Sequence, residues 1–158
     1  MIRAHRHLGY GLLALLILAA DQSTKYAVQH LVGPGRYVPV AGSVFGIRLV
    51  ENKGMAFSLF QSGGPVLVFV TLAAIGVIFY YSRRAGHLHP LMAPALALQL
   101  GGAFGNLVDR IRLGHVVDFL YLSFWPTFNV ADAAITVGAV LLGYCLVTAP
   151  DPARTETS

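Results

Sequence analysis

Residues 101–132, GGAFGNLVDRIRLGHVVDFLYLSFWPTFNVAD, join one long apolar run to the next and concentrate the polar side chains of this chain. Three of its five aspartates lie here: Asp109, Asp118 and Asp132. A charged side chain at the centre of a bilayer costs roughly 2.5–3.5 kcal/mol. Because carboxylates beside long apolar runs are costly, we expect at least some of these aspartates to serve a function.

The composition indicates a membrane protein of one domain. The chain has 158 residues, of which 56% are apolar and 11% are charged, whereas about 25% are charged in typical soluble domains. The net charge is +4, but the basic residues are scattered, so the basic stripe of a nucleic-acid-binding protein is absent from the sequence. Cys145 is the single cysteine and lies in the last apolar run, where we expect a small buried side chain.

Four apolar runs predict transmembrane helices, because about 20 apolar residues cross a bilayer. The first run could also be a secretory signal peptide cut after Ala20. Leu18 is large for the position three before such a cut, and three apolar runs follow, so a first helix is favoured. The expected spans are 8–28, 65–81, 91–108 and 130–148.

Four spans place both chain ends and the 82–90 connector on one side of the membrane, and the loops 31–64 and 109–128 on the other. Arg3, Arg6, Arg83 and Arg84 lie close to span ends on the first side. Positive residues in short loops mark the cytoplasmic side, so we expect both termini to be cytoplasmic. A polar tail is expected at 151–158.

Residues 36–50 predict a small β-sheet in the first loop. Phe45, Ile47 and Leu49 alternate with more polar neighbours, and Pro39 indicates an edge strand. The segment is too short and too polar to cross a membrane. The predicted fold class is therefore an all-α membrane protein with four transmembrane helices and a small β-sheet cradle on the membrane surface.

On this topology, polar residues from the ends of the first, third and fourth helices and from both loops fall near one membrane face. Asp21 and Lys25 share a helix face, which fits either a local ion pair or a pair that steadies a site. Asp109 is expected in an ion pair or at a helix end, and Gly101 and Gly105 are expected to serve helix packing. The gathered residues are Asp21, Asn52, Asn106, Arg110, Asp118, Asn129 and Asp132.

The candidate chemistry is that of a carboxylate pair. Histidines in metal-ligand spacing are absent from this group, and Ser43 and Ser123 lack an evident base. Asp118 has apolar neighbours in the sequence, which predicts a raised pKa. Asp132 follows Asn129 by three residues, a spacing typical of a capping box. Two aspartates that share a proton can hydrolyse a peptide bond.

Two other classes of protein remain open. An ion- or proton-coupled transporter also uses membrane acids, but they would lie at mid-membrane on discontinuous helices. A non-enzymatic assembly protein would use the polar residues only to pack its helices. The clustering of acids at one face favours the peptidase.

Five motifs in order resemble those of the bacterial lipoprotein signal peptidase family, signal peptidase II. They are DQSTK at 21–25, NKGMAF at 52–57, GGAFGNLVDR at 101–110, VVDF at 116–119 and FNVAD at 128–132. The resemblance covers nearly the whole chain, from the first span to the fourth. It implies an aspartic endopeptidase of the inner membrane, with its active site near the periplasmic face and its sheet on the periplasmic surface.

The resemblance also implies roles for residues and partners. Asp118 and Asp132 would be catalytic, and the substrate would be a prolipoprotein cut before its diacylglyceryl cysteine. We expect a monomer in contact with membrane lipid, without metal or other cofactor, and sensitive to globomycin as the family is. The residues implied to support the site or hold the substrate are Asp21, Lys25, Asn52, Gly54, Asn106, Arg110 and Asn129.

Overall fold

The computed structural model describes residues 2–54, 64–82 and 89–148. An apolar segment expected at 55–60, most of the 82–90 connector and the polar tail at 151–158 lie outside the described residues. The described part contains four long helices and one four-stranded sheet. The helices are α1 (Ile2–Leu31), α2 (Gly64–Ser82), α3 (Met92–Leu113) and α4 (Val130–Thr148).

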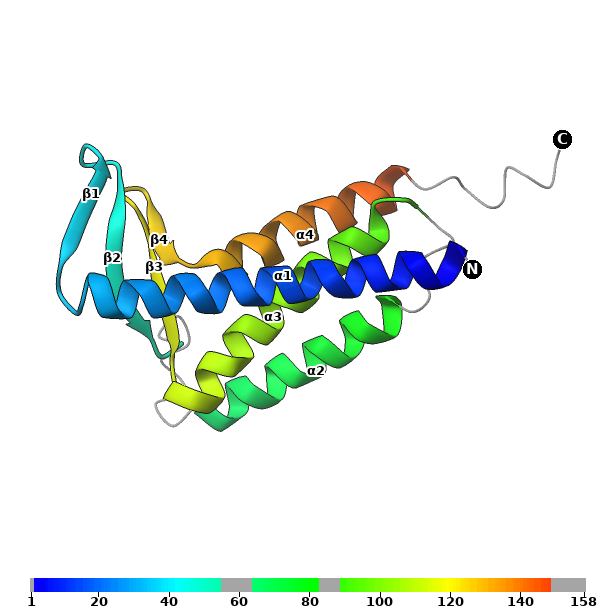
Figure 1. Cartoon of the computed structure of the whole chain (residues 1–158), viewed down its shortest axis with the longest axis horizontal. Helices are drawn as coiled ribbons and strands as arrows, with labels where there is room; N and C mark the ends of the chain where they lie inside the picture. The colour runs from blue at the N-terminus through cyan, green and yellow to red at the C-terminus, as the bar shows by residue number, and fades with distance from the viewer. Residues whose placement is uncertain (1, 55–63, 83–88, 149–158) are drawn as a thin grey trace, which may run out of the picture.

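Helix α3 is the centre of the bundle and packs against the other three helices (Figure 1). Consecutive helices run in opposite directions, so the start of α1 and the end of α4 lie at the end of the molecule opposite the sheet (Figure 1). The sheet end therefore gathers the end of α1, the start of α2, the end of α3 and the start of α4. Residues far apart in sequence meet there.

Glycines on α3 allow its neighbours to approach closely. A Cβ at Gly101 would lie 2.5 Å from the Ala14 carbonyl oxygen of α1, and a Cβ at Gly102 would collide with the Ala131 carbonyl oxygen of α4. Small residues at helix contacts are typical of membrane bundles, where close backbone approach supplies the packing energy. The helix-packing role expected for the glycines of the GGAFG segment at 101–105 is confirmed.

The outer faces of the helices expose large apolar side chains, among them Phe69 of α2 and Val147 of α4. Two helical segments in the described residues are long and apolar enough to cross a membrane, Pro65–Ser82 and Val130–Thr148, each with a mean hydropathy of 2.0. Helices α1 and α3 carry charged residues near the sheet end. Four helices are confirmed, and their all crossing the membrane stays a prediction.

The sheet is antiparallel, in the order β1-β2-β3-β4. Its strands are β1 (Tyr37–Ala41), β2 (Phe45–Asn52), β3 (Val116–Leu122) and β4 (Trp125–Phe128). The strands expected within 36–50 are present, and Pro39 lies on the edge strand β1 as expected. Gly46 of β2 lies against the Tyr37 ring, where a Cβ would collide.

The stretch 109–128, expected as a loop, contains regular structure instead. Helix α3 continues to Leu113 and ends at Gly114, whose φ of 76° caps the helix. Strands β3 and β4 follow. Residues 116–119 of β3 are all buried, so the strand lacks the alternation of apolar and polar residues that would have revealed it in the sequence.

Candidate active site

Asp118 on β3 and Asp132 in the first turn of α4 are held by the same residue, Asn129. The Asn129 side-chain nitrogen donates to Asp118 Oδ1 over 2.7 Å, and its backbone N–H donates to Asp132 Oδ2 over 3.3 Å. Asn129 is completely buried. One buried residue therefore contacts both carboxyl groups.

Asp132 is fixed by the start of α4 and by α3. Its backbone N–H donates to Asn129 Oδ1 over 2.8 Å, and this bond, together with the reciprocal bond from the Asn129 backbone, confirms the predicted capping box. Asn106 of α3 donates its side-chain N–H to Asp132 Oδ1 over 2.7 Å. Both oxygens of Asp132 thus accept hydrogen bonds close to a helix N-terminus, which favours a negative charge there.

Asp118 lies in the buried first half of β3. The residue is 1% exposed, and Asn52 of β2 donates to its Oδ2 over 2.9 Å. Burial raises the pKa of Asp118 to about 6, and the charge of Asp132 adds to the rise, while the hydrogen bonds from Asn52 and Asn129 oppose it. The raised pKa expected for this carboxyl group is confirmed.

Gly54 acts on the site through Asn52. Its backbone N–H donates to Asn52 Oδ1 over 2.8 Å, which orients the side-chain amide toward Asp118. The φ of Gly54 is 77°, a left-handed backbone conformation that residues other than glycine rarely adopt. A Cβ there would also lie 2.6 Å from Leu67 of α2.

Lys25 links three residues near the carboxylate pair, namely Asp21, Asn106 and Asp109. Its ammonium group lies 2.8 Å from Asp21 Oδ2 and 2.8 Å from Asp109 Oδ2, and it donates to Asn106 Oδ1 over 3.1 Å. All three of its N–H donors are therefore used. The expected Asp21–Lys25 ion pair is present. Asp109 also forms an ion pair, but its partner is Lys25 on another helix and not a neighbour at the end of α3.

Asp21 connects α1 to the start of α4. Its Oδ1 accepts a hydrogen bond from the Ala131 backbone N–H over 2.9 Å, which satisfies one of the free donors at the start of that helix. Gly105 of α3 makes room for this carboxylate, because a Cβ at Gly105 would lie 2.5 Å from Asp21 Oδ2. Gly105 therefore serves the site as well as the packing of the helices.

The sequence did not single out Gln22, whose side-chain N–H donates to Asp109 Oδ1 over 2.9 Å and to the Gly105 carbonyl oxygen over 3.1 Å. Asp109 was expected only in a local role. The sequence did indicate a place for Asp109 near the site, because Asp109 follows Asn106 by three residues and so lies on the same face of the helix.

Arg110 lies at the edge of the site and is half-buried. One of its guanidinium nitrogens donates to the Asn106 carbonyl oxygen over 3.3 Å. Its charge is attracted electrostatically by Asp132, Asp109 and Asp118. In residues 2–54, 64–82 and 89–148 its guanidinium forms no ion pair within 4 Å.

The described residues contain no group of three or more histidine, cysteine or acidic side chains arranged to hold a metal ion. The arrangement that is present consists of one carboxyl group with a pKa of about 6 and a second carboxylate held by N–H donors. Such a pair can share one proton and orient a water molecule.

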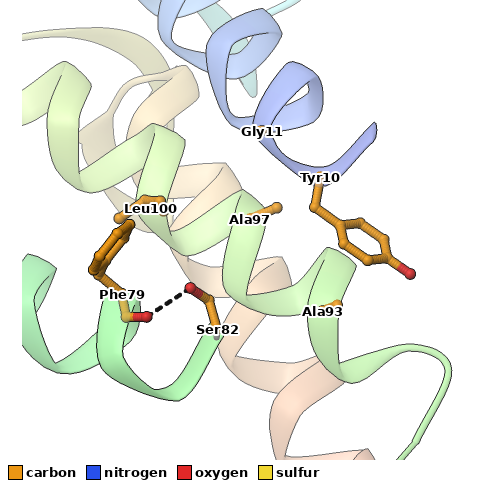
Figure 2. Close-up of a pocket in the computed structure, with 7 residues that line it drawn as sticks. All are labelled: Tyr10, Gly11, Phe79, Ser82, Ala93, Ala97 and Leu100. Atoms are coloured by element: carbon orange, nitrogen blue, oxygen red, sulfur yellow. Dashed lines mark hydrogen bonds between the residues drawn. The ribbon is translucent and has the colours of Figure 1, made fainter. Parts of the chain in front are cut away.

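A separate pocket of about 430 Å³ lies between α1, α2 and α3. Figure 2 shows its lining, in which the Ser82 hydroxyl donates to the Phe79 carbonyl oxygen over 2.8 Å. In the part of the chain that the structure describes, none of the residues lining this pocket is acidic or basic. The lining residues are Tyr10, Gly11, Phe79, Ser82, Ala93, Ala97 and Leu100.

Comparisons with known proteins agree on one family. The family model described as Signal peptidase (SPase) II matches residues 13–148. The chain is 46% identical to a lipoprotein signal peptidase of Moorella thermoacetica over 136 residues, which cover 86% of this chain and 91% of the relative. It is 42% identical to that of Caldanaerobacter subterraneus over 141 residues, which cover 85% and 96%.

Two solved structures, each titled as that of a bacterial membrane enzyme determined by the in meso method, share the fold. The structure at 1.9 Å resolution has a TM-score of 0.82 and 27% sequence identity, covering 89% of this chain and 93% of the other. The structure at 2.3 Å resolution has a TM-score of 0.81 and 26% identity, covering 88% and 87%. With a family model that matches most of its length and relatives above 40% identity, the chain belongs to the signal peptidase II family of lipoprotein signal peptidases.

Proposed function

We propose that the protein is an aspartic endopeptidase that removes signal peptides from prolipoproteins by cutting before the diacylglyceryl cysteine, with Asp118 and Asp132 as its catalytic pair. The observation that carries the proposal is the bridge made by Asn129, which donates to both carboxyl groups. The family supplies the substrate class, since the relatives are named lipoprotein signal peptidases.

The proposed reaction uses the two aspartates in different protonation states. Asp132, whose carboxylate faces the Asn106 and Asn129 N–H donors, takes a proton from water, and the resulting hydroxide attacks the scissile carbonyl carbon. The pKa of Asp118, about 6, lies above the usual value for aspartate and favours its protonated form. Asp118 gives its proton to the carbonyl oxygen. The proton on Asp132 then passes to the leaving amine as the C–N bond breaks, and one hydroxyl of the tetrahedral intermediate returns its proton to Asp118 as the C=O bond re-forms, which restores the pair.

The remaining polar residues support this reaction in the proposal. Asn52, oriented by Gly54, and Asn129 hold Asp118, while Asn106 holds Asp132. Lys25 and Asp21 join α1 to the site. Arg110, half-buried at the edge of the site and attracted by the charges of the aspartates, is proposed to hold the backbone of the substrate.

The location of the site suits a substrate that lives in the bilayer. We propose that all four helices cross the inner membrane, that both termini are cytoplasmic and that the sheet lies on the periplasmic surface. Asp118 on β3 and Asp132 at the start of α4 belong to the sheet end of the bundle, where these elements meet (Figure 1). We propose that water reaches the pair through Asp132, which is half-buried, and that the apolar outer helix faces contact lipid and the signal helix. Strands β1 and β2 are proposed to cradle the extended peptide.

Cleavage of a lipidated prolipoprotein by the purified protein tests the proposal. We expect the diacylglyceryl substrate to be cut before its cysteine, and the same precursor without its lipid to be cut poorly or not at all. No cleavage by folded protein would contradict the proposed function. Proton-driven uptake by vesicles containing the protein would instead support a transporter.

The pH dependence of kcat/KM tests the assignment of Asp118 as the protonated member. Activity should fall as the pH rises through about 6, the pKa of Asp118, because the pair then loses its shared proton. The Asn52 hydrogen bond favours the ionised form, so Asn52→Ala should raise the pKa and move the alkaline limb upward by roughly half to one pH unit. An unmoved limb, or one that shifts to lower pH, would show that another group sets it.

A further inference from the structure

Asp109 is a buried carboxylate that the proposed reaction does not use. It is 3% exposed, yet three donors from two elements converge on it. Lys25 Nζ of α1 lies 2.8 Å from Oδ2, the Gln22 side-chain N–H of α1 donates to Oδ1 over 2.9 Å, and the Val117 backbone N–H of β3 donates to Oδ2 over 3.0 Å. A carboxylate that only ended a helix would not need partners on another helix and on a strand.

The bond to Val117 fixes the path of the chain just before Asp118. It closes the connection from the last turns of α3, through the Gly114 turn, to the start of β3. The Val117 carbonyl oxygen in turn accepts an N–H from Asn129 over 3.3 Å. The backbone N–H and the carbonyl oxygen of Val117, the residue before Asp118, are therefore both held by hydrogen bonds.

The bond to Lys25 connects Asp109 with the other member of the pair. Lys25 also donates to Asn106 Oδ1, and Asn106 donates to Asp132 Oδ1. Two short routes thus start at the Lys25–Asp109 ion pair: one leads through Val117 to Asp118, the other through Asn106 to Asp132. Displacing Asp109 would loosen both carboxyl groups relative to each other.

We infer that Asp109, itself oriented by Gln22, is a positioning residue that sets the relative placement of Asp118 and Asp132; this inference rests on the proposed function. The buried trio of Asp21, Lys25 and Asp109 holds two negative charges and one positive. In Asp109→Asn the Asp21–Lys25 pair stays neutral and intact, so the fold should persist. Lys25 and Val117 both contact Oδ2, and Gln22 contacts Oδ1. If the single oxygen of asparagine takes the place of Oδ2, its NH2 group faces the Gln22 N–H donor, so the three contacts cannot all be kept.

Single-turnover cleavage with enzyme in saturating excess separates positioning from stability, because only folded, substrate-bound molecules contribute to the rate constant. We expect Asp109→Asn to lower that rate constant about 10- to 100-fold, since small displacements of catalytic groups cost this much. The enzyme concentration at half-maximal rate should change less than about threefold. Gln22→Met, which frees one oxygen of Asp109 and leaves its ion pair, should give a smaller decrease in the same direction.

Arg112→Gln is the matched control, because it also removes a charge from the last turn of α3 but at an exposed position. It should keep the wild-type rate constant. A wild-type rate constant with only a reduced amplitude in Asp109→Asn would reveal a purely structural role and overturn the inference. If Asp109→Asn does not fold, a wild-type rate constant in Gln22→Met overturns it. If the wild-type protein cleaves no prolipoprotein, the proposed function fails and this inference with it.

Discussion

Asp118→Asn and Asp132→Asn are each expected to lower the rate of prolipoprotein cleavage by about 10,000-fold while the protein still folds in the membrane. Asparagine has nearly the shape of aspartate but can neither take the proton from water nor deliver one to the carbonyl oxygen. Because the two carboxyl groups act as a unit, the double substitution should cost little more than either single one.

The measurement is the initial rate of cleavage by purified variants, followed by the appearance of the cut lipoprotein. Arg112→Gln, an exposed charge change in α3, is again the control and should retain full activity. Full activity in either aspartate variant would defeat the assignment of the pair. Thermal unfolding close to that of the wild type would confirm that the loss is chemical, because neither substitution empties a buried space.

Lys25→Met is expected to destabilise the protein by about 3–5 kcal/mol, the usual cost of removing one partner of a buried ion pair. Asp21 is fully buried and Asp109 is 3% exposed, so the substitution leaves two carboxylates facing each other without a counter-charge. In a domain whose stability is about 5–15 kcal/mol, such a loss should lower the unfolding midpoint by about 10 °C or prevent insertion.

Thermal unfolding of the purified variants in detergent tests this expectation. The triple variant Lys25→Met, Asp21→Asn and Asp109→Asn is the informative control, because it removes the trio as a whole and leaves no unpaired charge. It should recover most of the stability lost in Lys25→Met, although its activity should stay low. Wild-type stability in Lys25→Met would contradict the role assigned to this ion pair.

Local sequence patterns anticipated the parts of the fold whose causes are local. The apolar run at 130–148 coincides with α4, and the Asn129–Asp132 spacing marks its start, because a capping box needs only residues within one turn. Pro39 indicated an edge strand because proline has no backbone N–H to donate to a neighbour. Strand β3 escaped notice because its first half is buried on both faces and shows no alternation.

The candidate site likewise combines features that the local sequence predicts with contacts that it does not. The acidic residues could be expected to gather at one membrane face once the four helices were placed. Their partners could not be read from the spacing, since Gln22 and Asp109 are 87 residues apart and Lys25 and Asn106 are 81 apart. The closeness of α1 and α3 that joins them depends on Gly101 and Gly105 meeting Ala14 and Asp21.

The sequence by itself therefore determined the four helices, the strands of the first loop, the family and the two candidate aspartates. Apolar run length and capping depend on neighbouring residues, and the order of the motifs is read directly along the chain. Only the tertiary structure decided that Asn129 bridges the two carboxyl groups and that Asp109 ties β3 to α1. Hydrogen bonds and ion pairs are set by distances of about 3 Å, and those distances arise from how the helices pack.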